Sequence, residues 1–143
     1  MLNVQQILSR KGRAIFHVAP DATVYEALQS MAEHDCGALL VLDGKRAIGV
    51  VSERDYARKV VLSGRMSKDT PVRDIMGELV EVSPCSSVAT CMAIMTERRT
   101  RHLAVCEGAV LVGVISIGDV VKSVIDEQEF TIRQLETYIT GSR

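Results

Sequence analysis

Aromatic residues, clustered metal ligands and an excess of one charge are all missing from this sequence. Tryptophan is absent and aromatic residues make up 3% of the chain, so the stacking platforms of single-strand nucleic-acid binders are not expected. The net charge of −1 excludes a generally basic nucleic-acid-binding surface. The four cysteines form no Cys-x-x-Cys pair and the three histidines are isolated. We therefore expect no nucleic-acid partner, no metal site and buried, reduced thiols.

Long hydrophobic runs are also missing. No apolar stretch approaches the ~20 residues that a helix needs to cross a bilayer. Residues 1–13 show no apolar segment of the kind found in secretory signals. We expect a cytoplasmic protein without a membrane partner. The length of 143 residues, with 47% apolar and 24% charged residues, is typical of one compact domain or of two halves that share a core.

The chain contains an internal repeat. When the sequence is shifted by 64 residues, 17–61 lies over 81–125 without a gap, and thirteen of the 45 aligned positions are identical. Most of the remaining pairs are conservative, such as Ile48 with Val112. The match indicates a duplication.

Each copy predicts the same succession of elements. A short strand ends at Val18 or Val82, and a helix with an apolar stripe follows, for which Thr23 and Glu26 provide a capping box in the first copy. Two apolar strands then form a hairpin around Gly44 or Gly108, and a second helix begins after it. We expect an α/β fold in which two β-α-β-β-α repeats, related by a pseudo-twofold axis, pack into one module. The expected division is 1–70 for an N-terminal helix with the first repeat and 71–143 for the second repeat with a C-terminal helix.

Two segments lie outside the repeats. Residues 2–9 predict a short helix that returns to cover the core. Residues 124–139 predict an amphipathic helix with Ile125, Ile132, Leu135 and Ile139 as its apolar stripe. This stripe fits either a dimer contact or packing on its own chain, and we expect a homodimer.

The candidate chemistry lies at the same place in both copies. Gly-x-x-Ser-x-x-Asp ends at Asp55 in the first copy and at Asp119 in the second. A helix N-terminus after a strand suits an anion such as phosphate, and a carboxylate one turn later can accept hydrogen bonds from a ribose diol, each worth roughly 1.5–3 kcal/mol. The same spacing also fits a plain capping box, with serine as the N-cap and the acid at N3. The duplication does not decide between these interpretations, because a cap is duplicated as readily as a binding site.

Two such units, each ending in this motif, resemble a tandem pair of cystathionine-β-synthase (CBS) domains, also called a Bateman module. The segment from Thr70 to Met76 is similar to the usual lead-in of the family, and the resemblance covers nearly the whole chain. It is strongest to small bacterial proteins that consist of a stand-alone CBS pair. The resemblance implies two clefts between the repeats that bind adenine nucleotides, with the aspartate on the ribose, apolar residues around the adenine and the serine near the phosphates.

The resemblance also implies two crossed sets of binding residues. The first site would comprise Ser52, Arg54, Asp55, Leu79, Val80, Arg101 and His102. The second would comprise Ile15, Phe16, Cys36, Gly37, Ala38, Ser116, Ile117 and Asp119. Candidate phosphate contacts are Lys11, Arg13, Arg58, Lys59 and Arg65.

The two expected sites differ in charge. Arg101 and His102 give the first site a cationic phosphate end, whereas Gly37 and Ala38 stand at the matching positions of the second. Lys11 or Arg13 would then have to supply the second site's charge. The basic segment 54–73 is either a solvated face with a linker or a grip on a longer ligand.

The sequence thus favours a non-catalytic sensor that binds AMP, NAD(H), ADP, ATP or S-adenosylmethionine and signals to an unknown regulated partner protein, without a catalytic cofactor. One alternative is an interaction scaffold with vestigial clefts, which predicts no stabilisation by nucleotide. The other is a nucleotide-processing enzyme, which predicts turnover that depends on Asp55 or Asp119.

Overall fold

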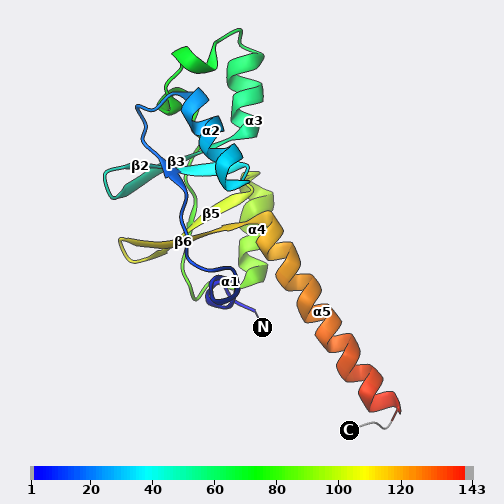
Figure 1. Cartoon of the computed structure of the whole chain (residues 1–143). Helices are drawn as coiled ribbons and strands as arrows, with labels where there is room; N and C mark the ends of the chain where they lie inside the picture. Colours follow the sequence, from blue (N-terminus) through cyan, green and yellow to red (C-terminus); the bar gives the residue numbers. More distant parts are fainter. Residues whose placement is uncertain (1, 141–143) are drawn as a thin grey trace. The chain divides into compact units, whose positions relative to one another are not determined.

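The computed structural model describes residues 2–140 and divides into two compact units (Figure 1). The first-repeat unit is Ala14–Val80. The second-repeat unit combines Met1–Arg13 with Glu81–Arg143. Each unit carries one three-stranded sheet and helices packed with it, so the expected α/β class is confirmed.

The first-repeat unit contains the expected β-α-β-β-α succession. Its elements are β1 (His17–Val18), α2 (Val24–His34), β2 (Ala38–Asp43), β3 (Arg46–Ser52), α3 (Glu53–Tyr56), the π-helical η1 (Ala57–Val61) and the 3₁₀ turns η2 (Ser67–Asp69) and η3 (Val72–Asp74). The strand order is β1-β2-β3, with β1 parallel and β3 antiparallel to β2. Buried apolar residues from α2, the sheet, η1 and η3 form its core.

The second-repeat unit has the same sheet. Its elements are α1 (Val4–Lys11), β4 (Glu81–Val82), α4 (Val88–Arg98), β5 (His102–Glu107), β6 (Val110–Ser116) and α5 (Ile117–Thr140). The register repeats as well, since Val41 pairs with Gly49 in one sheet and Val105 pairs with Gly113 in the other. Both hairpins also shift register directly after this pair. The duplication therefore extends from sequence to strand pairing.

Local signals set the ends of the first helix of each repeat. Thr23 caps α2, and Glu26 completes the predicted capping box. Ser87 caps α4 by accepting a hydrogen bond from the backbone N–H of Thr90. Both helices end at a non-glycine residue in the left-handed region, Asp35 with φ 51° and Arg99 with φ 53°.

The paired glycines Gly49 and Gly113 let neighbouring chain come close to the sheet. A Cβ atom on Gly49 would lie 2.9 Å from the sulfur of Met76 and 3.0 Å from the carbonyl oxygen of Gly77. A Cβ atom on Gly113 would lie 2.7 Å from a methyl group of Leu8. Each glycine thus accommodates a segment of its own unit.

The N-terminal helix is confirmed as a covering element of a core. Val4, Ile7 and Leu8 are buried, and α1 packs against β6 and α5. The first residue of α1 is tied to the second repeat, because the backbone N–H of Val4 donates to the carbonyl of Ser86 at 2.9 Å. In space, α1 therefore groups with the second repeat, although the division at residue 70 places it with the first.

The helix expected over 124–139 is the continuation of the helix that begins after Ser116, and together they form the 24-residue α5. In Figure 1, α5 runs on well past the end of α4. All residues from 127 to 140 are exposed. The apolar stripe therefore does not pack on the described part of its own chain. Among residues 2–140, no helix combines the length and apolarity required of a membrane span.

Candidate functional site: the paired Ser-x-x-Asp motifs

The motif of the first repeat forms a complete capping box where β3 passes into α3. The backbone N–H of Ser52 donates to Oδ2 of Asp55 at 2.9 Å, and the backbone N–H of Asp55 donates to Oγ of Ser52 at 3.1 Å. The Ser52 hydroxyl also donates to Oδ2 at 3.0 Å. The capping interpretation of this motif is therefore confirmed. It does not exclude a ligand, because a carboxylate has further acceptor positions.

The second oxygen of Asp55 has a cationic partner on its own helical segment. Nζ of Lys59 lies 3.3 Å from Oδ1 of Asp55 and donates to the carbonyl of Ile75 at 2.9 Å. Lys59, a candidate phosphate contact, thus lies at the candidate ribose-binding carboxylate.

The motif lies beside the beginning of β2. The backbone N–H of Glu53 donates to the carbonyl of Gly37 at 3.0 Å, which joins the start of α3 to the residue before Ala38. Leu79 and Val80 are half-buried in the segment that precedes β4. Their role around an adenine stays a prediction.

The motif of the second repeat has the same cap. The backbone N–H of Ser116 donates to Oδ2 of Asp119 at 2.8 Å, and the backbone N–H of Asp119 donates to Oγ of Ser116 at 3.2 Å. The backbone N–H of Ile117 donates to the carbonyl of Arg101, as Glu53 does to Gly37 in the other copy.

Asp119 receives its cation from α1. Nζ of Lys11 lies 2.7 Å from Oδ2 of Asp119 and donates to the carbonyl of Val114 at 2.8 Å. Burial raises the pKa of Asp119, but the hydrogen bonds from Lys11 and Ser116 outweigh it and hold the pKa below its ordinary value. Lys11 therefore lies at this motif as the ion-pair partner of Asp119, and its role as a phosphate contact stays a prediction. Arg13, the other candidate, instead donates to the side chain of Gln5 at 3.2 Å.

His102 adds little positive charge near neutral pH. Burial lowers its pKa, and the charges of Lys11 and Arg101 lower it further, against the opposite effect of Asp119. The cationic phosphate end expected of this pair would then depend on Arg101.

Other predicted residues have structural partners in the first-repeat unit. The ring of Phe16 stacks on His34 with ring centroids 4.1 Å apart. The Cys36 thiol donates to the carbonyl of Ala38 at 3.4 Å, and Ile15 is half-buried. The approach of these residues to Asp119 stays a prediction.

The basic segment 54–73 is only partly available to a ligand. Arg65 forms an ion pair with Asp74 at 2.8 Å, and Arg73 pairs with Asp21. Arg54 and Arg58 are exposed. Arg65 is therefore engaged within its own unit, which favours the structural interpretation for that residue.

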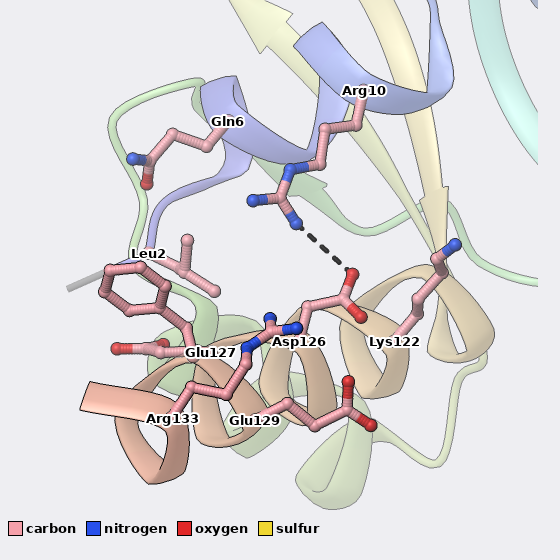
Figure 2. Close-up of a pocket in the computed structure, with 9 residues that line it drawn as sticks. Leu2, Gln6, Arg10, Lys122, Asp126, Glu127, Glu129 and Arg133 are labelled. Atoms are coloured by element: carbon pink, nitrogen blue, oxygen red, sulfur yellow. Dashed lines mark hydrogen bonds and ion pairs between the residues drawn. The ribbon is translucent and has the colours of Figure 1, made fainter. Parts of the chain in front are cut away.

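Sequence reasoning missed a cavity of about 680 Å³ between α1 and α5 (Figure 2). Its lining consists of Leu2, Gln6, Arg10, Lys122, Asp126, Glu127, Glu129, Phe130 and Arg133. Arg10 crosses it to Asp126 at 3.3 Å. A smaller cavity of about 110 Å³ adjoins the same helices and includes Asp119 in its lining. No sequence signal marks these cavities, because they depend on α1 packing beside α5. Among residues 2–140, no cluster of three or more histidine, cysteine, aspartate or glutamate side chains has metal-binding geometry.

Two duplicated sheets, each ending in a capped serine–aspartate pair, define a tandem α/β repeat module. The sequence model of the CBS domain matches residues 4–62 and 72–126. The chain belongs to the CBS-domain family.

Solved and curated relatives agree with this assignment. A CBS-domain protein from Burkholderia ambifaria is 53% identical, with a TM-score of 0.86 over 89% of this chain and 96% of that one. The mitochondrial CBS domain-containing protein CBSX3 of Arabidopsis thaliana is 37% identical over 96% of this chain and 72% of its own length. A CBS domain protein from Pyrobaculum aerophilum, solved in complex with AMP, is 27% identical, with a TM-score of 0.72 over 82% of this chain and 89% of that one.

Proposed function

We propose that this protein is a non-catalytic regulatory module that binds an adenine nucleotide at its Ser-x-x-Asp motifs and passes the signal to a partner protein. The observation that carries the proposal is the duplicated motif in a chain of the CBS family, one of whose relatives was solved with AMP. Asp55 and Asp119 would hold the ribose. The preferred ligands are AMP and NAD(H). A cytoplasmic location belongs to the same proposal.

The contacts within each unit support a polar ligand at both motifs. Each aspartate is fixed by its capping box, so its carboxylate is oriented before a ligand arrives. Each also has a lysine within reach, Lys59 at Asp55 and Lys11 at Asp119. When a ribose diol replaces the lysine at the aspartate carboxylate, the lysine can turn to a phosphate. Carboxylate and phosphate are both favourable partners for an ammonium group.

One observation favours the alternative of a scaffold without a ligand. Both carboxylates already have lysine partners, so a nucleotide must compete with these ion pairs. The competition is modest, because an ion pair at this degree of exposure is worth about 0–1 kcal/mol.

A thermal-shift panel separates the two functions. The protein is first tested for bound nucleotide by acid extraction and chromatography, then melted with AMP, ADP, ATP, NAD(H) and S-adenosylmethionine, with GMP and CMP as controls. A ligand at ~100 times its dissociation constant adds about 2.7 kcal/mol of stability, which moves the melting temperature by several degrees. A shift with adenine compounds alone supports the sensor. A flat panel from nucleotide-free protein rejects it in favour of the scaffold.

A further inference from the structure

The exposed face of α5 follows a heptad rather than a broad helical stripe. Its positions are separated by alternating steps of four and three residues. They are Val121, Ile125, Gln128, Ile132, Leu135 and Ile139, which we call the seam. The five apolar members are 45–79% exposed. A strict four–three spacing is the pattern of a two-stranded coiled coil, whereas a helix that covers a globular core carries a wider stripe.

The side chains on the seam match a parallel pair. Isoleucine occupies each a position, at 125, 132 and 139, and Leu135 occupies a d position. β-Branched residues at a with leucine at d favour two parallel strands. Gln128 is the one polar member of the seam. In a parallel, in-register pair it meets its own copy, and two amides can satisfy one another, whereas an antiparallel pair would leave it facing Ile132.

The flanking charges are compatible with the same arrangement. The e positions of the heptad hold Lys122, Glu129 and Glu136, and in a parallel pair they face the g positions of the other helix, Ile117, Val124 and Thr131. Like charges are therefore not opposed across the pair.

The face of α5 that carries Asp126 and Arg133 is already assigned within the unit. Arg10 of α1 reaches Asp126 there, and Arg133 lines the cavity between the helices (Figure 2). In the second half of the helix, every residue from 127 to 140 is exposed. The exposed half of the helix gains little from tertiary packing in its own unit, so a partner on the seam would add to its stability.

We propose that a second copy of this chain covers the seam, forming a parallel, two-stranded coiled coil through α5. The pairing is independent of nucleotide binding. It holds two modules side by side at their α5 helices.

The first test is the mass of the full chain in solution, by sedimentation or light scattering, for the wild type, Ile132→Glu and Thr137→Glu. Ile132 is on the seam, whereas Thr137 lies nearby on the opposite face of α5. Both variants introduce glutamate, so they add the same charge on different faces of the helix. We expect Ile132→Glu to halve the mass of the assembly and to raise its dissociation constant by at least roughly 100-fold, because it buries two unpaired charges. Thr137→Glu should behave as the wild type. Equal masses for all three proteins, or a monomeric wild type, would overturn the proposal and leave the seam to a helix of another protein.

The second test concerns orientation. In a Cys85→Ser background, Ile139→Cys should form a disulfide-linked pair under mild oxidation, whereas Thr137→Cys should not. In the antiparallel pair that sets Gln128 against Ile132, residue 139 of one helix lies opposite Val121 of the other. The two copies of residue 139 would then lie roughly 27 Å apart along the axis, at a rise of ~1.5 Å per residue. Failure of Ile139→Cys to link, in protein that is dimeric by mass, would reject the parallel pair. A thermal shift with nucleotide on Ile132→Glu reports the binding function separately.

Discussion

Nζ of Lys11 donates to Oδ2 of Asp119 across 2.7 Å and thereby joins α1 to the start of α5. The aspartate of the first repeat is paired differently, with Lys59 four residues further along its own helical segment. The duplication places Ser123 at the position that matches Lys59. The two repeats therefore share a carboxylate but not the source of its cation, which for Asp119 is the N-terminal helix.

Lys11→Met should destabilise the fold, and the effect should depend on pH. The pKa of Asp119 is lowered in the folded protein, so its stabilising contribution is present above the unfolded pKa of about 3.9 and is lost as the pH falls through the folded value. Without Lys11, burial is less opposed and the contribution shrinks. We expect a loss of about 1 kcal/mol at pH 7 that is smaller at pH 3, measured by urea unfolding. Lys45→Met, at the exposed turn of the first hairpin, is the control. A loss of equal size at both pH values would contradict the assigned role of Asp119.

Asp55→Ala tests the ribose role under the proposed function. Loss of two charge-assisted hydrogen bonds should cost about 2–3 kcal/mol, or roughly 30- to 150-fold in nucleotide affinity, measured by calorimetry. The variant also loses a capping box, with an expected cost of about 1 kcal/mol in folding stability. Glu26→Ala removes the equivalent box from α2 and is the matched control. If both variants bind nucleotide like the wild type, Asp55 is a cap and nothing more.

Much of the fold could be predicted because its signals are local and occur twice. The Thr23–Glu26 box, the turn at Gly44 and the start of a helix after Ser52 each depend on residues within a few positions of one another. Because the second copy lies 64 residues further along the chain, each of these elements was predicted twice from two related stretches of sequence. The motif aspartates were found in the same way, since a duplicated carboxylate stands out against variable neighbours.

The rest depended on contacts between distant residues. Lys11 and Asp119 are 108 positions apart, and the sequence offered Lys11 only as one of two candidates. The grouping of α1 with the second repeat follows from backbone hydrogen bonds to Pro84 and Ser86, which no pattern of side chains announces. The continuity of α5 was also missed, because the sequence predicted one helix after Ser116 and a separate helix over 124–139. The first turns of the single helix pack within the unit, and its later turns are exposed.

Gly113→Ala should be destabilising because its new Cβ atom would overlap a methyl group of the buried Leu8. We expect a loss of about 1–3 kcal/mol in the free energy of unfolding, as for other overpacked cores. The double variant Leu8→Ala/Gly113→Ala should lose less than the sum of the two single variants, since the smaller side chain makes room. Gly118→Ala is the matched control. Its Cβ atom would meet only Oγ of Ser116 at 3.6 Å, and alanine favours the helix, so this variant should be as stable as the wild type or more so. Additive losses at Leu8 and Gly113 would show that α1 does not press on β6 at this point.

Cys106 should resist alkylation in the native protein. Burial and a hydrogen bond to Glu81 raise the pKa of its thiol to about 11, so at pH 8 it should carry roughly two orders of magnitude less thiolate than an ordinary thiol. We expect iodoacetamide to modify the exposed Cys85 first and Cys106 much later, as followed by peptide mass spectrometry. Glu81→Gln should speed the reaction of Cys106, because it removes the negative charge that opposes ionisation, while the rate at Cys85 stays unchanged. In urea, Cys106 and Cys85 should react at similar rates. Native Cys106 reacting as fast as Cys85 would show that the thiol is neither buried nor bonded to Glu81 in solution.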